Sequence, residues 1–141
     1  SVLCNHDYLV CEKSDGIRYL LYFCCPPEMG PGAFLIDRNY EFLWLPGLAL
    51  PRRHNPRELQ EETLLDGELI LDEDGPEAES LEAQHESHET SETDLKAQKG
   101  GVLKFVIFDA LMVDAVSLMN APLNRRLQCV QNDVSNARAV K

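Results

Sequence analysis

The sequence predicts an α+β domain built mainly from antiparallel β-strands. Its 141 residues are 44% hydrophobic, which is enough for one modest domain with its own core. Short apolar runs rich in β-forming residues alternate with turn-forming residues along most of the chain. A helical spacing of apolar residues occurs only near the C-terminal end, so few helices are expected.

Six apolar runs are expected to form strands. They are residues 8–11, 19–25, 33–38, 41–45, 63–71 and 104–113. The proline- and glycine-rich residues 26–32 predict a loop, because prolines and glycines favour turns over continuous strands. Asn39 and Tyr40 separate two of the runs closely enough to predict a hairpin. Trp44, in the second strand of this hairpin, is expected in the core.

A helix is expected near the C-terminal end, where three apolar residues recur at about the helical period. These residues are Leu123, Leu127 and Val130. Asn120 is the expected N-cap, and Ala121-Pro122 fits the first turn. Residues 57–62 are expected to form one or two helical turns, and residues 114–115 a turn.

The negative charge of the chain is concentrated in one segment. The formal charge is −11, and ten acidic residues without a single Lys or Arg lie between Asp72 and Asp94. Outside this window 14 acidic residues face 13 basic ones. We therefore expect a disordered acidic insert at about residues 73–101 and a near-neutral remainder, which need not repel an anionic substrate. His85 and His88 within it are not expected to bind a metal.

The cysteines favour a reduced, intracellular protein, because they show neither a CxxC pair nor a disulfide framework. They are Cys4, Cys11, Cys24, Cys25 and Cys129, and we expect them in the core without zinc. The sequence has no apolar run long enough to span a membrane and no signal peptide. Its abrupt start and polar tail suggest a segment of something longer.

The segment Glu12–Arg18 lies between two expected strands and carries the first candidate site. A lysine at a strand end beside a cleft can be partly desolvated, which leaves a neutral amine able to attack an electrophile. Lys13 is therefore a candidate nucleophile beside the tight-turn dipeptide Asp15-Gly16, and Arg18 could bind phosphate or sugar oxygens. The alternative is an ordinary solvated hairpin lysine.

A pair of carboxylates interrupts the expected strand at residues 63–71. Asp66 and Glu68 are two residues apart, so both side chains should point to the same side of a strand. Acids in an otherwise buried strand are costly unless they meet a cation, a metal or hydroxyl groups. The pattern indicates a cleft, and the alternative is a solvent-facing hairpin.

Two further charged segments are open to two interpretations. Asp37-Arg38 closes an apolar strand and could lie at a cleft or form an ordinary surface ion pair. Residues 46–57 form a proline-rich basic loop that could contact an anionic polymer or could simply be solvated. Its charged residues are Arg52, Arg53, His54 and Arg57.

Four segments, taken in order, resemble the eukaryotic mRNA capping enzyme family. These guanylyltransferases belong to the covalent nucleotidyltransferase superfamily, which also contains ATP-dependent DNA and RNA ligases. Residues 12–18 resemble the nucleophile motif K-x-D-G-x-R, and residues 34–39 resemble the strand that follows it. Residues 63–69 are similar to the capping-type T-L-L-D-G-E-L, and residues 105–109 to a later F-D strand. The sequence of residues 123–127, Leu-Asn-Arg-Arg-Leu, most resembles fungal capping enzymes.

The resemblance implies an mRNA guanylyltransferase with a ping-pong mechanism. Lys13 would attack the α-phosphorus of GTP to form a covalent lysyl-GMP, and the GMP would then pass to the 5′-diphosphate end of nascent mRNA. Arg18 and Glu68 would hold the ribose hydroxyls, Arg38 would lie on the sugar-phosphate side, and Phe108 would stack on guanine. Mg²⁺ or Mn²⁺ would neutralise phosphate charge.

The resemblance also implies supporting residues and partners. The residues that would shape the nucleophile loop and the cleft are Asp15, Gly16, Asp66 and Gly67. The implied partners are an RNA triphosphatase subunit or domain and the RNA polymerase II C-terminal tail, in the nucleus and without a membrane.

The chain departs from the family pattern in two ways. Ala115 stands where the family has glycine, which costs roughly 1 kcal/mol at positive φ. No D-G-x-I-F strand, K-x-K strand or OB-fold domain follows. We therefore expect residues 1–141 to be a partial, ATP-grasp-like nucleotidyltransferase domain, the nucleophile-bearing half, with no metal ligands of its own. Alone it should be inactive or weak.

Two other functions remain open from the sequence. An ATP-dependent polynucleotide ligase would share the Lys13 motif, although residues 37–38 and 63–69 speak against it. A catalytically incompetent remnant would act only as a binding module for a partner.

Overall fold

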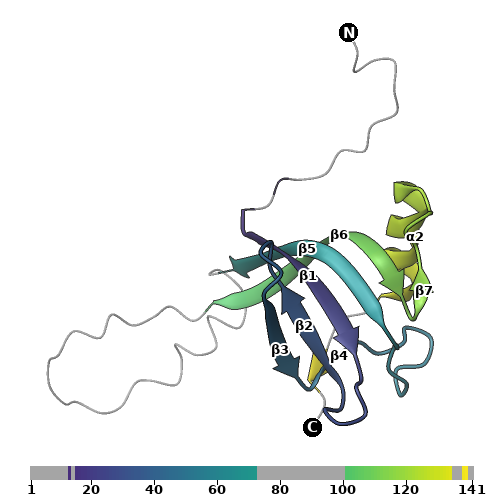
Figure 1. Cartoon of the computed structure of the whole chain (residues 1–141). Coiled ribbons are helices and arrows are strands. Elements are labelled where there is room, and N and C mark those ends of the chain that lie inside the picture. Colours follow the sequence, from purple (N-terminus) through teal and green to yellow (C-terminus); the bar gives the residue numbers. More distant parts are fainter. Residues whose placement is uncertain (1–12, 14, 73–100, 135–137, 140–141) are drawn as a thin grey trace, which may run out of the picture.

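The computed structural model describes residues 13, 15–72, 101–134 and 138–139. The strands in these ranges are β1 (Ile17–Cys24), β2 (Gly32–Ile36), β3 (Phe42–Pro46), β4 (Leu48–Ala49), β5 (Thr63–Asp72), β6 (Val102–Val113), β7 (Val116–Ser117) and β8 (Arg138–Ala139), and the helix is α2 (Leu123–Asp133). Six strands form one antiparallel sheet in the order β3-β2-β1-β5-β6-β7, and β4 pairs with β8 in a second, small sheet. Helix α2 lies against β6 (Figure 1). The predicted α+β class with a mainly antiparallel sheet is confirmed.

Five of the six predicted strands are present, and residues 8–11 lie outside the described part of the chain. The predicted hairpin is confirmed, although β2 ends at Ile36 rather than at Arg38. Asp37 ends the strand because its Oδ1 accepts the backbone N–H groups of Asn39 at 2.8 Å and Glu41 at 2.9 Å. The acidic insert expected at about 73–101 also falls outside the described residues, apart from Gly101.

The C-terminal helix is confirmed, but its predicted cap is wrong. Pro122, with an extended backbone, occupies the N-cap of α2, and no side chain caps the helix. The Pro122 carbonyl accepts the N–H groups of Arg125 and Arg126, so the helix begins after the proline without help from Asn120.

The helical turns expected at residues 57–62 are absent. Their backbone pairs instead with the preceding segment: Gln60 N–H donates to the Leu50 carbonyl, and Pro51 bridges to Leu59. The loop therefore folds back on itself, because these extended contacts take the backbone groups that a helix would use.

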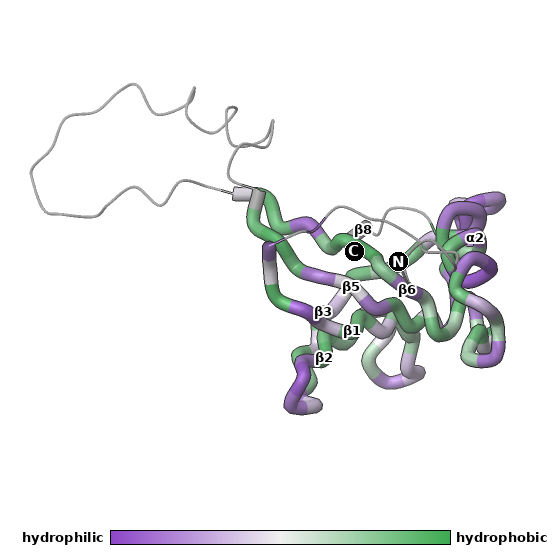
Figure 2. The backbone as a smooth tube through the Cα atoms, turned by 90° about the horizontal axis from the view of Figure 1, so that it is seen from above, coloured by the Kyte–Doolittle hydropathy of each residue, from purple (hydrophilic) through white to green (hydrophobic). Residues whose placement is uncertain are grey.

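The buried core gathers at the centre of the large sheet. Its buried members are Leu21, Phe23, Ala33, Leu35, Leu50, Leu65, Ala110 and Val113. Hydropathy along the chain follows this arrangement, since the central strands are largely hydrophobic while α2 carries both colours (Figure 2). Trp44 was expected in this core but is only half-buried. It lies on the edge strand β3 and packs against Phe34, with ring centroids 4.7 Å apart and ring planes tilted by 48°.

The three described cysteines are free thiols. Cys24 and Cys129 are half-buried, whereas Cys25 is exposed, so the expectation of a core position is wrong for Cys25. Cys25 follows the last residue of β1 and enters the loop to β2. Cys4 and Cys11 lie outside the described residues. No helix in the described part of the chain has both the length and the apolar content to span a membrane.

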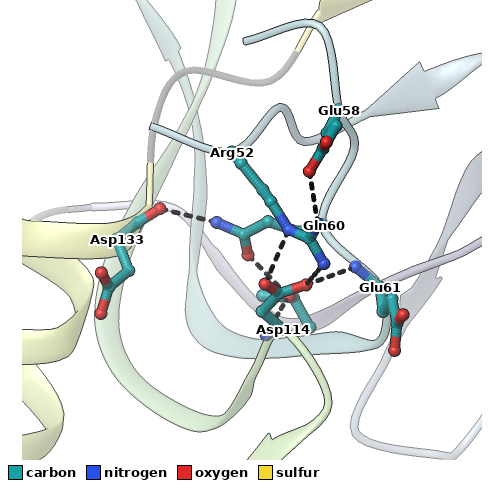
Figure 3. A network of polar contacts seen from close by, with 7 residues as sticks. Arg52, Glu58, Gln60, Glu61, Asp114 and Asp133 are labelled. Atoms are coloured by element: carbon teal, nitrogen blue, oxygen red, sulfur yellow. Dashed lines mark hydrogen bonds and ion pairs between the residues drawn. The ribbon is translucent and has the colours of Figure 1, made fainter. Parts of the chain in front are cut away.

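An ion-pair network fixes the turn between β6 and β7 (Figure 3). The Asp114 carboxylate accepts from Arg52 Nε at 2.9 Å and Nη2 at 3.2 Å, and from the Glu61 N–H at 2.8 Å. Arg52 Nη1 also donates to Glu58 at 2.7 Å. The turn holds Asp114 and Ala115 at φ values of 48° and 65°. The family pattern, which has glycine at the position of Ala115, implied a positive φ for that residue.

The same network reaches the end of helix α2. Thr63, which is fully buried, accepts the Asp114 N–H at 3.0 Å and donates to Gln60 Oε1 at 2.8 Å. Gln60 Nε2 in turn donates to the Asp133 carbonyl at 2.6 Å. A chain of buried polar contacts thus ties the loop after β4, the β6–β7 turn and α2 into one unit.

Candidate functional site

Lys13 lies just before β1 with its side chain in solvent. Its side chain is 92% exposed and forms an ion pair with Asp15, whose Oδ1 lies 3.7 Å from Lys13 Nζ and whose side chain is 96% exposed. The expected partial desolvation of Lys13 is therefore wrong for the described structure. The physical reason is that β1 begins only at Ile17, and no element of the described residues covers the amine.

Gly16 brings the nucleophile segment directly against β5. Its backbone N–H donates to Glu68 Oε1 at 3.1 Å. A Cβ at this position would lie 2.3 Å from the Leu69 carbonyl oxygen and 2.6 Å from Ile70 Cγ2, so only glycine allows the close approach. The lack of a side chain at position 16 thus leaves room for the backbone of β5.

Arg18 and Asp66 form a two-point ion pair across β1 and β5. Arg18 Nε lies 2.9 Å from Asp66 Oδ1, and Nη2 lies 2.5 Å from Oδ2. The hydrogen bond to Asp66 raises the pKa of the Arg18 guanidinium. Arg18 is 73% exposed while Asp66 is only 13% exposed, so the carboxylate is not solvent-facing. Of the three partners considered for the acids of this strand, namely a cation, a metal or hydroxyl groups, the structure shows a cation for Asp66.

Glu68 lies directly opposite Arg18 in the β1–β5 register. Leu20 lies opposite Asp66 in the same pairing, so both carboxylates occupy one face of the sheet, as their spacing predicts. The structure therefore brings together four predicted groups of these two motifs: the Gly16 N–H, the Arg18 guanidinium and the carboxylates of Asp66 and Glu68.

Gly67 allows β6 to approach β5 closely. A Cβ on Gly67 would lie 2.3 Å from the Val106 carbonyl oxygen and 2.7 Å from the Phe105 ring. Next to this contact the register shifts, with Asp66 opposite Asp109 but Gly67 opposite Ile107. Phe108, the predicted base-stacking residue, lies at this irregularity, and it is 37% exposed.

Arg38 lies in the exposed turn after β2. The antiparallel register places Leu20 opposite Ile36, so the turn follows at the same end of the sheet as Arg18. No hydrogen bond or ion pair joins Arg38 to the other predicted site residues in the described part of the chain. Asp37 binds backbone N–H groups of its own turn, so of the two interpretations of Asp37-Arg38 neither a cleft nor an ion pair is seen.

Two arginines of the basic loop at residues 46–57 bind acceptor groups within the protein. Arg52 pairs with Asp114 and Glu58, and Arg53 donates to the Gln131 carbonyl. The possible contact of these two arginines with an anionic polymer is therefore not supported, since internal acceptors already bind them. His54 and Arg57 are exposed.

Two cavities lie beside this loop rather than beside Lys13. A cavity of about 590 Å³ lies between the loop and α2, and one of about 360 Å³ adjoins it. None of the predicted site residues lines either cavity. The described residues contain no group of three or more His, Cys, Asp or Glu side chains arranged to hold a metal.

Sequence reasoning missed two ion pairs that the structure shows. They are Arg52–Asp114 and Arg126–Asp109, whose partners lie 62 and 17 residues apart. Asp109 lies within β6 and Asp114 begins the turn after it, but nothing in their spacing selects the arginine that each one meets.

Comparisons with known proteins agree with the resemblance of the motifs. A family model described as mRNA capping enzyme, catalytic domain, matches residues 1–84. The mRNA-capping enzyme subunit alpha of Neurospora crassa is 33% identical over 126 residues, covering 87% of this chain and 26% of the relative. The proteins of the same name from Yarrowia lipolytica and Saccharomyces cerevisiae are each 31% identical, covering 95% and 89% of this chain and 29% and 24% of the relative.

The chain thus spans about a quarter of the length of the curated relatives that it matches. The family model covers more than half of the chain, and the matched residues include the nucleophile motif and the T-L-L-D-G-E-L strand. The chain therefore belongs to the mRNA capping enzyme family, which it matches in the catalytic domain.

Proposed function

We propose that the chain carries the nucleophile-bearing segments of an mRNA guanylyltransferase. One observation carries the proposal: the Gly16 N–H donates to Glu68 at 3.1 Å, which joins the K-x-D-G-x-R segment to the D-G-E strand. Beside it the Arg18 guanidinium is held by Asp66. A backbone-anchored nucleophile loop next to a fixed cation suits the binding and transfer of a nucleotide.

In the first step the Lys13 amine would attack the α-phosphorus of GTP. A nitrogen–phosphorus bond forms, the bond to the bridging oxygen of pyrophosphate breaks, and the amine loses a proton. Because Lys13 is hydrated in the described structure, this role requires the bound nucleotide to displace water from the amine.

In the second step the 5′-diphosphate end of nascent mRNA would accept the GMP. A terminal phosphate oxygen attacks the phosphorus of lysyl-GMP, and the nitrogen–phosphorus bond breaks to regenerate Lys13. Arg18 and Glu68 would hold the ribose hydroxyls, and Phe108 would stack on guanine. Arg38, at the same end of the sheet, would approach the sugar-phosphate side.

The described residues do not supply a ligand set for Mg²⁺ or Mn²⁺, since no cluster of three suitable side chains occurs among them. Asp66 is also already paired with Arg18. We therefore assign no step to a metal held by these residues.

The wider setting follows from the same proposal. We place residues 1–141 in a covalent nucleotidyltransferase domain, with an acidic insert at about 73–101. The relatives' name, mRNA-capping enzyme subunit alpha, is consistent with a partner subunit. We propose an RNA triphosphatase subunit or domain and the RNA polymerase II C-terminal tail as partners, in the nucleus.

Covalent labelling tests the proposal. The full chain is incubated with α-labelled GTP or ATP and Mg²⁺ or Mn²⁺, and separated on a denaturing gel. We expect a weak, acid-labile adduct from GTP, with intact-mass analysis showing the added GMP. Label from ATP alone would replace the capping assignment with a polynucleotide ligase.

The exposure of Lys13 favours one second function, a binding module without catalysis. The amine is 92% exposed and its ion-pair partner Asp15 is 96% exposed, so this contact does little to hold the amine in one position. Complete absence of an adduct, together with retained binding of a capping subunit, would support this function over the first.

A further inference from the structure

The β6 strand contains an irregularity at Phe108. Asp66 of β5 lies opposite Asp109, and the next residue, Gly67, lies opposite Ile107, so Phe108 has no residue opposite it in the β5 register. An extra residue of this kind is a β-bulge, which bends the strand locally and redirects a side chain. The direction of the Phe108 ring therefore depends on what fixes the backbone around it.

A two-point ion pair from helix α2 fixes the residue next to Phe108. Arg126 Nε lies 2.7 Å from Asp109 Oδ1, and Nη2 lies 2.9 Å from Oδ2. Asp109 Oδ1 also accepts the Ala110 N–H at 2.8 Å, and Arg126 Nη1 donates to the Ala121 carbonyl at 2.6 Å. The pair is thus connected on one side to the β6 backbone and on the other to the start of α2.

The ion pair is partly shielded from water, with side-chain exposures of 22% for Arg126 and 26% for Asp109. Two parallel hydrogen bonds between a guanidinium and a carboxylate define an orientation as well as a distance. Helix α2 itself has no fully buried residue, although Val130 packs against the core. The Arg126–Asp109 pair is therefore a specific link between the helix and the bulge.

We propose that Arg126 is a positioning residue: through Asp109 it fixes the β6 bulge and with it the direction of Phe108. The connection to guanine binding rests on the proposed function, in which Phe108 is the stacking residue. Helix α2 then contributes to nucleotide recognition without touching the nucleotide.

A fluorescent reporter at position 108 tests this. The full chain with Trp44→Phe and Phe108→Trp carries a single tryptophan at the bulge, and acrylamide quenching and anisotropy report its freedom. Adding Arg126→Lys keeps the positive charge but removes the planar guanidinium group that makes two parallel hydrogen bonds. We therefore expect the quenching constant of the tryptophan at position 108 to rise about twofold and its anisotropy to fall. GTP affinity, read from quenching by the nucleotide, should weaken about five- to tenfold.

Two controls separate positioning from general loosening. Arg125→Lys changes the adjacent arginine, whose Nη1 donates to Gln128 Oε1 at 3.2 Å, and should leave the reporter unchanged. Natural Trp44, on the distant strand β3, should keep its quenching constant when Arg126→Lys is made in the otherwise unaltered chain. Should Arg126→Lys fail to fold, Asp109→Asn provides the same test from the other side of the pair.

Unchanged quenching and anisotropy at position 108 in folded Arg126→Lys and Asp109→Asn chains would overturn the inference. If Phe108→Ala still weakened GTP binding in that case, the proposed function would stand and only the positioning role would fail. If the unaltered chain bound no GTP and formed no adduct, the proposed function would fail, and the reporter's freedom would still decide the role of Arg126.

Discussion

Arg18 Nε and Asp66 Oδ1 lie 2.9 Å apart, and a second contact of 2.5 Å joins Nη2 to Oδ2 across strands β1 and β5. The two residues come from segments 48 positions apart, and the antiparallel pairing of β1 with β5 brings them together. The guanidinium is mostly exposed and the carboxylate is mostly covered, so Asp66 orients Arg18 toward solvent. Asp66 thus holds Arg18 in one orientation at the candidate site.

Asp66→Asn should lower GMP-adduct formation at least about tenfold, because a charge-assisted hydrogen bond contributes roughly 1.5–3 kcal/mol. The free energy of unfolding should fall by less than about 1 kcal/mol, since Arg18 is mostly solvated. Adduct kinetics and urea unfolding measure the two effects. Glu28→Gln, an exposed acid in the β1–β2 loop, is the control. Equal loss of stability and adduct would contradict a role in the site.

Lys13→Ala should abolish the GMP adduct and leave the free energy of unfolding within about 0.5 kcal/mol of the parent, because the side chain is exposed. Intact-mass analysis and chemical denaturation provide the measurements. Lys104→Ala, on β6, is the matched lysine control and should retain the adduct. An adduct that persists in Lys13→Ala would assign the nucleophile to another residue.

Gly16→Ala should destabilise the chain by about 1–3 kcal/mol and remove the adduct, because the new Cβ would meet the Leu69 carbonyl oxygen at 2.3 Å. Gly30→Ala makes a useful contrast. Gly30 has a φ of +71° and open space around it, so alanine there should cost roughly 1 kcal/mol through the backbone alone. The adduct should survive in Gly30→Ala. Denaturant unfolding and labelling of both variants measure these effects. Equal adduct levels in Gly16→Ala and Gly30→Ala would contradict the prediction.

Ala115→Gly should raise the free energy of unfolding by a few tenths to about 1 kcal/mol. Ala115 has a φ of 65°, and glycine relieves that strain at some cost in unfolded-state entropy. Ala121→Gly, where φ is not positive, should instead destabilise the chain. Urea midpoints at constant m-value measure both changes, and a loss of stability in Ala115→Gly would refute the strain argument.

Stability should fall in acid through Asp109 and Asp114. Hydrogen bonds from Arg126 and Arg52, respectively, lower the pKa of each carboxyl below its ordinary value. A depressed folded-state pKa stabilises the fold above the unfolded-state pKa of about 4, and this contribution is lost as pH falls through the folded-state value. The free energy of unfolding, measured with urea between about pH 3 and pH 6, covers this window.

Asp114→Asn is the matched variant for this pH dependence. It should be less stable than the parent at pH 6 and should lose less stability on acidification, because one of the two titrating carboxyls is gone. A parent and variant with identical slopes would show that Asp114 does not contribute to the acid response.

The motifs predicted the pairing of residues 12–18 with β5 better than they predicted the exposure of Lys13, the proposed nucleophile. Glu68 and Asp66 were expected on one side of a strand, and the period of two in an extended chain was enough to establish that. The exposure of Lys13 depends on what packs over it, and the local sequence does not contain that information. The Asn120 cap and the helical turns at 57–62 were wrong for a similar reason: Pro122 and the pairing of Gln60 with Leu50 provided competing backbone contacts.

By itself the sequence determined the antiparallel sheet, the positions of β1, β2, β3, β5 and β6, the C-terminal helix and the family, because alternation, turn residues and motif sequences are local properties of the chain. The short strands β4, β7 and β8 were not predicted. Only the tertiary structure decided which arginine meets which aspartate, that Gly16 is needed for a close backbone approach to Leu69, and that β6 bulges at Phe108. These features depend on contacts between segments distant in the sequence, and their geometry is fixed when the strands pair and α2 packs against β6.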